Sequence, residues 1–403
     1  MKKMENGRQR HSVGLRIGAL LVTAGLVMNT GASVQADATP VGQVTGVAAS
    51  VTFKDISSHW AKASIEQAVK KGYVNGYADG TFQPNRQISR AEYTKMLVSA
   101  LGLEVVPQEG GKWYDAYFAA ASQAGITSAA EFNNNVDKAL TRAEMARLAM
   151  KALGEKNTDA KKWMYLTTKA GIMSGSGAGD IGADKTTTRA ESITVIERIL
   201  TVKNGATLKA DKYAVQAAEL YWHKTNIFTV MPEFFTDTKY PTIYNPNDLF
   251  IESTDKQYYA VVDAIVAIDL ADPKDPNLKL LPPLKSLRWD NNVRNGGMPL
   301  INYKDSYVIL VQKHIVRTNE KYGNDLLAIF YGLSDQGKND EFRKGILTKP
   351  AGLYEEGGSK TAICATVFPK KGSKTEDGGF RLVLSPPVNN SNVKSVLFAN
   401  PNF

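Results

Sequence analysis

Apolar side chains recur with helical spacing in three segments of the N-terminal half, and each segment opens on nearly the same five residues. These openings are 88–92, 140–144 and 187–191, each with a Ser or Thr three positions before a Glu. In such a capping box the hydroxyl accepts the backbone N–H of the Glu, and the carboxylate accepts the backbone N–H of the cap residue. Each opening therefore predicts the start of a helix, and the last Leu of its apolar pattern lies 11 positions after the Arg in all three.

A shorter apolar pattern precedes each capped helix and ends at a glycine. The spacing from this glycine to the Arg of the capped helix is nearly constant; the pairs are Gly72 and Arg90, Gly125 and Arg142, and Gly171 and Arg189. Gly102 and Gly154 follow the first two capped helices, where a left-handed C-terminal cap is expected. The unit is thus a helix, a loop and a capped helix, repeated about every 50 residues. Because units this small bury their apolar faces against one another, we expect three copies in one body.

The first copy resembles the S-layer homology (SLH) domain. The resemblance rests on aromatic, glycine, acidic and small residues at Phe53, Asp55, Trp60, Ala61, Gly72, Tyr73, Val74, Gly76, Tyr77, Asp79, Gly80, Phe82, Pro84, Asn85 and 88–92. SLH domains occur as triplets on bacterial surface proteins and bind pyruvylated secondary cell-wall polysaccharide. The resemblance covers residues 52–201 and implies a pseudo-threefold, all-α-dominated triplet, with copies at 52–104, 105–155 and 156–204.

In this family the groove between neighbouring repeats takes the pyruvylated sugar, and the Arg of the capped motif meets its carboxylate. The resemblance implies these polysaccharide-binding residues: Arg90, Asp55, Trp60 and Gly76 in the first copy, Arg142 and Trp113 in the second, and Arg189 and Gly175 in the third. The chemistry agrees, because a helix start presents free N–H groups and a guanidinium suits a carboxylate. The alternatives are a solvated Arg and a Trp buried in the core.

The second and third copies depart from the SLH pattern. The spacing expects Asp and glycine where the second copy has Gln108 and Ala129, and it expects Trp where the third copy has Asp159. These departures favour one well-formed site over three. The Glu residues of the three boxes are expected to act as caps alone, without a ligand role.

The first residues of the chain predict export. Residues 1–36 begin with Lys2, Lys3, Arg8, Arg10 and Arg16, followed by an apolar run at 17–28. This order is typical of a signal peptide, here cut after Ala36, and the run is shorter than the roughly 20 residues of a membrane anchor. Residues 37–51 are expected to form an exposed linker.

The net charge of +9 is misleading, because the leader contributes +4 of it. The rest of the chain is only mildly basic and has no block of Lys and Arg interleaved with aromatic residues. This pattern argues against a nucleic-acid partner. After removal of the leader, no membrane contact is expected either.

The chain changes character after residue 204. A helical pattern covers 213–223, and then apolar, β-branched runs alternate with loops rich in Pro, Asn, Asp and Gly; the runs are 258–268, 307–316, 326–331, 361–368, 380–384 and 393–398. Such runs predict strands, and the prolines between 229 and 286 limit helix there to short pieces. Residues 205–403 are therefore expected to form a β-rich α+β domain. Its single Cys364 is expected to be a buried, inert thiol.

The C-terminal domain carries no recognised catalytic motif. It has no Gly-x-Ser-x-Gly, no His-Glu-x-x-His and no phosphate-binding loop, and it holds only His223 and His314 of the chain's 4 histidines. No cofactor or metal is therefore expected. Glycoside hydrolysis needs only two carboxylates, so the acids at 263, 269, 272 and 275 leave a glycoside hydrolase as an alternative. The simpler interpretation is that these acids are solvated residues of turns.

The sequence thus favours a multidomain, exported, non-catalytic surface protein of the cell wall or S-layer. The SLH triplet would anchor it non-covalently to pyruvylated secondary cell-wall polysaccharide, and several modest grooves on one body would gain avidity. Two alternatives concern the C-terminal domain: a wall-anchored enzyme that cleaves glycans or peptides, and a surface adhesin or ligand-binding module. Self-assembly into a lattice also stays open.

Overall fold

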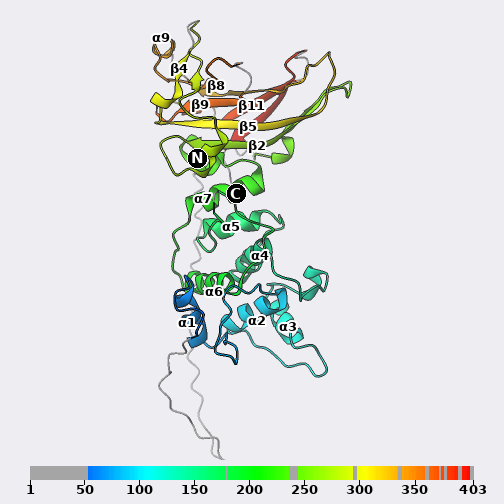
Figure 1. Ribbon diagram of the computed structural model, residues 1–403. Helices are drawn as coiled ribbons and strands as arrows, with labels where there is room; N and C mark the ends of the chain where they lie inside the picture. The colour runs from blue at the N-terminus through cyan, green and yellow to red at the C-terminus, as the bar shows by residue number, and fades with distance from the viewer. Residues whose placement is uncertain are drawn as a thin grey trace, which may run out of the picture. The chain divides into compact units, whose positions relative to one another are not determined.

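The structure is a computed structural model that describes residues 53–177, 179–235, 244–293, 297–334, 338–358, 363–371, 374–375, 379–388 and 393–399. Helices occupy its N-terminal part and β-sheets dominate its C-terminal part, as predicted (Figure 1). The predicted signal peptide at 1–36 and the linker at 37–51 lie outside the described residues. None of the described helices combines the length and hydropathy that a bilayer-spanning segment needs.

The three predicted capping boxes are confirmed. α2 (Arg90–Ala100), α4 (Arg142–Ala152) and α6 (Arg189–Lys203) each follow a Ser or Thr that exchanges both hydrogen bonds with the Glu at the third position of the helix. In α2, Ser89 Oγ accepts from Glu92 N at 3.1 Å, and Ser89 N donates to Glu92 Oε2 at 2.8 Å. Because an N-cap stabilises a helix start by about 0.5–2 kcal/mol, the boxes fix where each helix begins.

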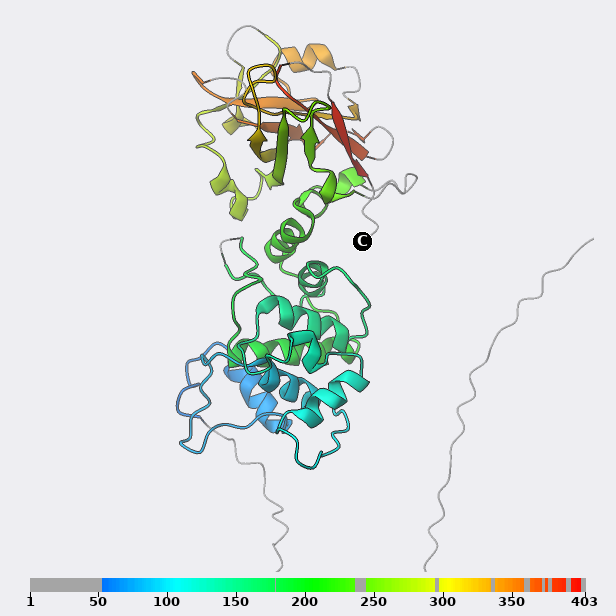
Figure 2. The same ribbon diagram turned by 90° about the vertical axis from the view of Figure 1, so that its right-hand side faces the viewer.

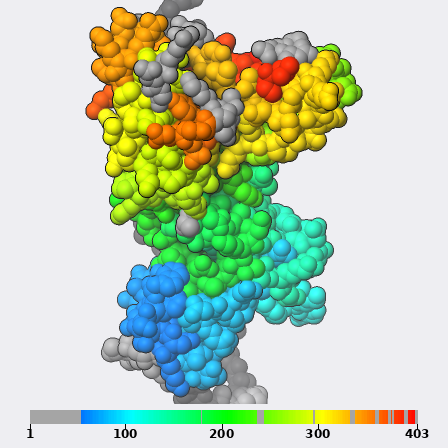
Figure 3. All heavy atoms as spheres, turned by 45° about the horizontal axis from the view of Figure 1, so that its top comes forward, coloured from blue at the N-terminus to red at the C-terminus, as the bar shows by residue number. Residues whose placement is uncertain are grey.

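A shorter helix precedes each capped helix, also as predicted. These helices are α1 (Lys62–Lys70), α3 (Asp115–Gln123) and α5 (Lys162–Lys169). α3 packs on α2, α5 packs on α4, and α1 packs on α6. Each short helix therefore lies against the capped helix of a neighbouring segment rather than its own. In the space-filling view, the blue and cyan segments of this region adjoin without a break (Figure 3).

The residues just before the three caps meet in a closed ring of main-chain hydrogen bonds. Ile88 N donates to Thr187 O at 3.2 Å, Thr187 N donates to Leu140 O at 2.9 Å, and Leu140 N donates to Ile88 O at 2.9 Å. All three residues are fully buried. The ring joins three segments that lie far apart along the chain, and it places the three helix starts around one point.

The predicted helix at 213–223 is confirmed as α7 (Lys212–His223). Its apolar face joins the core of the helical region through Ala214, Val215, Ala217 and Ala218. Only Leu220 packs against a cluster of the strand-rich region. The helical core thus continues beyond residue 204, and α7 packs mainly on what precedes it in the chain.

Each of the six apolar runs predicted as strands contains one. The large sheet has the order β1 (Phe250–Glu252), β2 (Tyr259–Asp269), β5 (Ser306–Arg317), β9 (Ala365–Pro369), β8 (Ala351–Glu355), β3 (Leu287–Trp289) and β4 (Met298–Pro299). A smaller sheet has the order β12 (Lys394–Ala399), β11 (Gly379–Ser385) and β6 (Leu327–Tyr331), and β10 (Lys374–Thr375) pairs with β7 (Leu333–Ser334). All described pairings are antiparallel, apart from a single parallel bridge between Thr225 and Ile265.

Short helical pieces link these strands. They are α8 (Ile227–Val230), α9 (Asn339–Arg343) and the 3₁₀ turns η2 (Pro232–Phe235), η3 (Pro246–Asp248), η4 (Pro276–Leu280) and η5 (Leu300–Asn302). Three of these turns begin with Pro, which suits the first position of a helix because it lacks the N–H that would be unpaired there. In the described parts of 229–286 helix occurs only in such short pieces, as predicted.

The large sheet is buried on both faces where β2 and β5 pair. On β5, Tyr307, Ile309 and Val311 enter one apolar cluster, while Val308 and Leu310 enter the other. Alternate side chains point to opposite faces of a strand, so a strand covered on both sides needs a continuous apolar run. This burial explains why β2 and β5 were visible in the sequence, and Figure 2 shows the resulting layers of strands.

Candidate functional site

The three predicted arginines are all held by the segment that comes next around the ring. Arg90 donates from Nη2 and Nε to the two oxygens of Glu144, at 2.6 and 3.2 Å, and from Nη1 to Asn135 O at 2.9 Å. Its guanidinium lies 5.1 Å from the centre of the Phe132 ring. Arg90 therefore joins the first capped helix to the second segment and has its donors engaged.

Arg142 and Arg189 are engaged in the same way and are buried. Arg142 donates to Ile181 O at 3.0 Å and to Ser174 O at 2.5 Å, and Arg189 donates to Asn75 O at 2.5 Å. Burial lowers the pKa of both guanidinium groups below the usual value, although not enough to cost either its charge. Each arginine thus holds the loop of a neighbouring segment by its main-chain carbonyls.

The prediction of free amides at the three helix starts is wrong. Arg90 N and Ala91 N donate to the carbonyls of Lys138 and Val136, at 3.0 and 2.9 Å. The amides at 142, 143, 189 and 190 bind carbonyls of other loops in the same manner, and the cap hydroxyls take the amides of the Glu residues. An anion would therefore have to bind beside these helix starts, through side chains, rather than on their amides.

One pocket, which we call the Trp60 pocket, brings together predicted residues from all three segments. It measures about 240 Å³ and is lined by Trp60, Arg142 and Gly175, together with Glu191 and Arg198. The Trp60 side chain is 66% exposed, so its alternative assignment to the core is wrong. The arrangement offers an indole face, a buried guanidinium and a carboxylate on one surface.

A second pocket, the Trp113 pocket, repeats this composition one segment further on. It measures about 520 Å³ and is lined by Trp113 and Arg189, together with Tyr77, Glu92 and Lys95. Trp113 is 53% exposed. Lys95 Nζ lies 5.8 Å from the centre of the Trp113 ring and 5.5 Å from that of Tyr117. A cation thus faces two aromatic rings across the pocket.

Both pockets are assembled from three segments in the same cyclic order. Each takes its Trp from one segment, its Arg from the next, and its loop and capped helix from the third. The resemblance predicts a groove between neighbouring repeats without saying which residues share it; in the structure Trp60 shares its pocket with Arg142 and Gly175. Lys95 and Arg198 were missed; the available signal was their place, at the fifth and ninth positions after the Arg of a capped helix.

Asp55 and Gly76 shape the loop that borders the Trp113 pocket. Asp55 accepts from Phe82 N at 2.8 Å and from Gln83 N at 2.7 Å, so its carboxylate is used inside the protein. A Cβ on Gly76 would lie 2.0 Å from the Phe53 ring, which only glycine avoids. Gly76 therefore lets the chain pass Phe53 between Asn75 and Tyr77, whereas Asp55 holds the chain at Phe82 and Gln83; neither Gly76 nor Asp55 lines the pocket.

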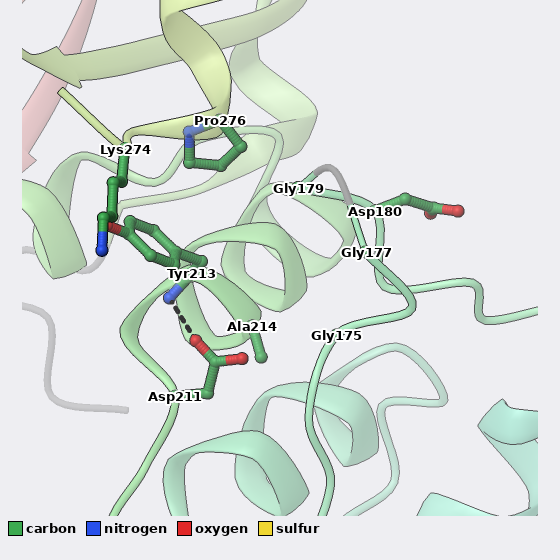
Figure 4. A pocket seen from close by; sticks show the side chains of 9 residues that line it. All are labelled: Gly175, Gly177, Gly179, Asp180, Asp211, Tyr213, Ala214, Lys274 and Pro276. Atoms are coloured by element: carbon green, nitrogen blue, oxygen red, sulfur yellow. Dashed lines mark hydrogen bonds between the residues drawn. The ribbon is translucent and has the colours of Figure 1, made fainter.

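Gly175 also borders a further pocket of about 360 Å³, shown in Figure 4. It is lined by Gly175, Gly177, Gly179 and Asp180, by the start of α7 and by the segment around Pro276. Asp211 accepts from Tyr213 N at 3.0 Å as the cap of α7, and Asp180 is paired with Lys185 at 2.6 Å. Figure 4 shows the Asp180 side chain turned away from the pocket. The two acids therefore do not converge on a reacting group.

In the described part of the strand-rich region, two pockets each contain one acid, and Cys364 lines both. Asp325 is bound to Lys313 at 2.6 Å, and Asp263 is bound to His314 at 2.9 Å. Burial raises the pKa of the Cys364 thiol, so the neutral thiol is favoured. Among the described residues, no group of three or more His, Cys, Asp or Glu side chains is placed to hold a metal ion.

Comparison with known proteins identifies the first helical segment. Residues 52–94 match the S-layer homology domain. An S-layer protein of Bacillus thuringiensis subsp. finitimus is 30% identical over 182 residues, which cover 39% of this chain and 22% of that protein. The exoglucanase XynX of Acetivibrio thermocellus is 30% identical over 181 residues, covering 38% of this chain and 17% of the enzyme.

A shorter and closer match is the cellulosome-anchoring protein of Acetivibrio thermocellus, 47% identical over 49 residues, which cover 12% of this chain and 11% of the relative. The chain spans less than a quarter of the length of each of these three relatives. What they share with it is a part of each protein and not the whole. Residues 52–94 are an S-layer homology domain, and the chain that carries them is an exported, cell-wall-associated protein.

Proposed function

We propose that the helical region anchors this protein non-covalently to the bacterial cell wall by binding an acidic secondary cell-wall polysaccharide. The observation that carries the proposal is the repeated composition of the Trp60 and Trp113 pockets, each with an exposed indole, a buried Arg and a second basic residue. A flat indole suits the apolar face of a sugar ring, and the cations suit an acidic substituent. The S-layer homology domain and the cellulosome-anchoring relative support the same function.

A pyruvylated amino sugar is the ligand that we propose for these pockets. A pyruvate ketal adds one carboxylate to the sugar ring, so it needs a cation beside a flat apolar surface. In the Trp113 pocket, Lys95 has no carboxylate partner among the residues that the structure describes, and two aromatic rings face it. A ligand carboxylate would give Lys95 a charge-assisted hydrogen bond while the sugar ring lies on Trp113. Arg198 supplies the corresponding charge in the Trp60 pocket, where one of its nitrogens, Nη1, donates to Ile172 O at 3.0 Å.

The buried arginines have a different part in this proposal. Arg142 and Arg189 line the pockets, but their hydrogen bonds go to loop carbonyls. Their positive charge stays at the pocket wall because a guanidinium is not deprotonated in proteins. We therefore assign them the tasks of holding the loops in place and attracting an anion. Arg90 is engaged with Glu144 and Asn135, so R90A would test folding more than binding.

The proposal includes three copies of one unit, at 52–104, 105–155 and 156–204, arranged about a pseudo-threefold axis. Three findings support it: the ring of hydrogen bonds through Ile88, Leu140 and Thr187, the cyclic packing of α1, α3 and α5, and the cyclic contacts of the three arginines. Two pockets on one body would act together on a polymer, because the second binding event is then intramolecular.

The strand-rich region, residues 205–403 in the predicted division, is proposed to be the part that the anchor holds at the surface. The acids in its two pockets, Asp325 and Asp263, are each paired with a basic residue. Among the described residues that line them, neither pocket brings a second Asp or Glu to face the first. We therefore place the proposed binding chemistry in the helical region.

Co-sedimentation of the purified protein with purified native wall polymer tests the proposal. The variants are Lys95→Ala and Trp113→Ala, with Lys156→Ala as the matched control, because Lys156 is exposed and lines neither pocket. Each of the first two should weaken binding by about tenfold, the effect of losing about 1.4 kcal/mol. K156A should bind like the unchanged protein.

The chemical nature of the ligand is tested by removing pyruvate from the polymer. Stripped polymer should leave the unchanged protein in the supernatant, whereas native polymer should pull it down. Equal sedimentation with both polymers would exclude the carboxylate as the recognised group. Equal binding of K95A and K156A to native polymer would exclude the Trp113 pocket.

A further inference from the structure

The two pockets predict a third, equivalent surface on α4. The Trp113 pocket uses the fifth and ninth positions after Arg90, which are Lys95 and Ser99, and the Trp60 pocket uses Thr194 and Arg198, at the same offsets from Arg189. On α4 these positions are occupied by Arg147 and Lys151. At these two helix positions the third surface therefore carries two cations, whereas each pocket carries one there.

Both of these cations are bound by one carboxylate from the protein itself. Glu131 lies in η1 (Ala129–Phe132), in the loop between α3 and α4, and it forms ion pairs with Arg147 Nη1 and with Lys151 Nζ, the latter at 3.3 Å. Lys151 Nζ reaches both oxygens of this carboxylate at 3.3 Å. The next residue, Phe132, lies under the guanidinium groups of Arg147 and Arg90, at 5.2 and 5.1 Å from its ring centre.

The corresponding loop of the first segment is different. There Tyr77 lines the Trp113 pocket, and Lys95 lies near two aromatic rings and forms no ion pair with the described residues. The third surface also lacks the tryptophan of the other two. Trp60 and Trp113 precede Gly72 and Gly125 at one spacing, whereas Asp159 occupies the same place before Gly171. Asp159 accepts a hydrogen bond from Trp222 Nε1 of α7 at 2.6 Å.

We propose that the Glu131 carboxylate takes the place of the polymer's carboxylate on α4, so that the helical region has two polymer sites and a third that is closed from within. This inference rests on the proposed function of the two open pockets. It explains why the surface with the most positive charge on its capped helix needs no ligand: Arg147 and Lys151 are already paired. Opening the third surface requires removal of a single negative charge.

Isothermal titration of the full chain with a monovalent probe tests this inference. The probe is the methyl glycoside of a pyruvylated N-acetylhexosamine, which carries one carboxylate. The unchanged protein should bind two equivalents, and Glu131→Gln should bind three. The third should be weaker by about tenfold, since about 1.4 kcal/mol of missing indole contact has that effect. Glu155→Gln, which removes one exposed acid just after α4, should still bind two.

A second readout separates opening of the site from a loss of packing. E131Q should melt at a lower temperature than the unchanged protein in plain buffer, because Arg147 and Lys151 lose their partner. The probe raises the melting temperature of every variant through the two open pockets, and it should raise that of E131Q by more, because E131Q has one further site. E155Q should melt and respond to the probe like the unchanged protein. A merely structural Glu131 would lower the melting temperature, and the probe would then raise it no more than it raises that of the unchanged protein.

The possible results bear separately on the two proposals. Two equivalents for both the unchanged protein and E131Q would overturn the closed third site and leave wall binding in place. Three equivalents for the unchanged protein would also overturn it, and this result does not depend on whether E131Q folds. No binding of the probe to any variant, including the unchanged protein, would overturn the proposed function itself and with it the closed site.

Discussion

The helical and strand-rich regions differ in how they use buried polar groups to join distant segments. In the helical region the joining groups are charged: Arg142 and Arg189 are each 8% exposed and bind loop carbonyls of another segment. In the strand-rich region a neutral side-chain amide joins distant segments. Asn226 is fully buried, donates to Ala267 O at 2.8 Å and accepts from Ala267 N at 2.7 Å.

The difference shows why function can be sought in one region more readily than in the other. A buried cation needs a matched surrounding, and the helical region builds one around Arg142 and another around Arg189. Repetition also places excess positive charge at regular positions near the surface. In the strand-rich region buried polar groups such as Asn226 form individual hydrogen bonds that are not repeated, and the charged side chains in its pockets form ion pairs.

The largest expected effect comes from removing Arg142, because its buried guanidinium joins the second helical segment to the third. Arg142→Ala leaves the carbonyls of Ile181 and Ser174 without the guanidinium that donates to them. It also removes the Arg142 charge that lies 4.0 Å from the Glu191 carboxylate. Removing one side of a buried charged contact costs about 3–5 kcal/mol. Urea unfolding followed by far-UV circular dichroism measures it. The exposed Arg381 of β11 provides the control, since R381A should change stability by less than about 0.5 kcal/mol.

An equal loss in R142A and R381A would remove the proposed contrast between the regions. If R142A loses much stability while the β-sheet signal keeps its original unfolding midpoint, the contrast between the two regions would become sharper. In that case the two regions would unfold separately, and the charged joints would stabilise the helical region alone.

A second expected effect concerns pH and lies in α7. Glu219 is fully buried, and burial raises the pKa of its carboxyl group to about 8, although Phe228 and Thr229 donate hydrogen bonds to it. Since the folded-state pKa lies above the ordinary value of 4.5, Glu219 stabilises the fold most below pH 4.5, and this stabilisation is lost as the pH rises through about 8.

Comparing the unchanged protein with Glu219→Gln isolates this group from other titrations. Between pH 5 and 8 the free energy of unfolding of the unchanged protein should fall relative to E219Q by up to about 1.4 kcal/mol per pH unit. Urea unfolding at several pH values measures the difference. Parallel pH profiles for the two proteins would show that Glu219 does not titrate in this window.

Much of the helical region was predictable because its signals are local. A capping box involves four consecutive residues, so Ser89 and Glu92 reveal their contact without knowledge of the fold. The strands buried on both faces, such as β5, were equally visible as continuous apolar runs. The missed strands β1, β3, β4, β7 and β10 have two or three residues each, and β8 is interrupted by Gly352. These short segments become strands because neighbouring strands of the sheet pair with them, and a segment's own sequence does not show its partner.

The composition of the pockets was not predictable, and the reason is how the segments pack. Trp60 meets Arg142 and Gly175 because α1 lies on α6 and each arginine reaches the next loop. The sequence of each copy therefore does not reveal which Trp, Arg and loop share one groove. The amides at the helix starts were misjudged for the same reason, since the carbonyls that bind them, such as Lys138 O, come from another segment.

The smallest expected effect tests whether a single exposed ion pair matters in the strand-rich region. Asp263 lies 2.9 Å from His314 Nδ1, and their side chains are 46% and 53% exposed. Exposed ion pairs contribute about 0–1 kcal/mol because water and salt screen them. Asp263→Asn should therefore change the midpoint of urea unfolding within error, while the buried amide variant Asn226→Ala should lose about 1–3 kcal/mol. A large loss in D263N would mean that this region also depends on charged contacts, and the contrast with the helical region would then reduce to repetition alone.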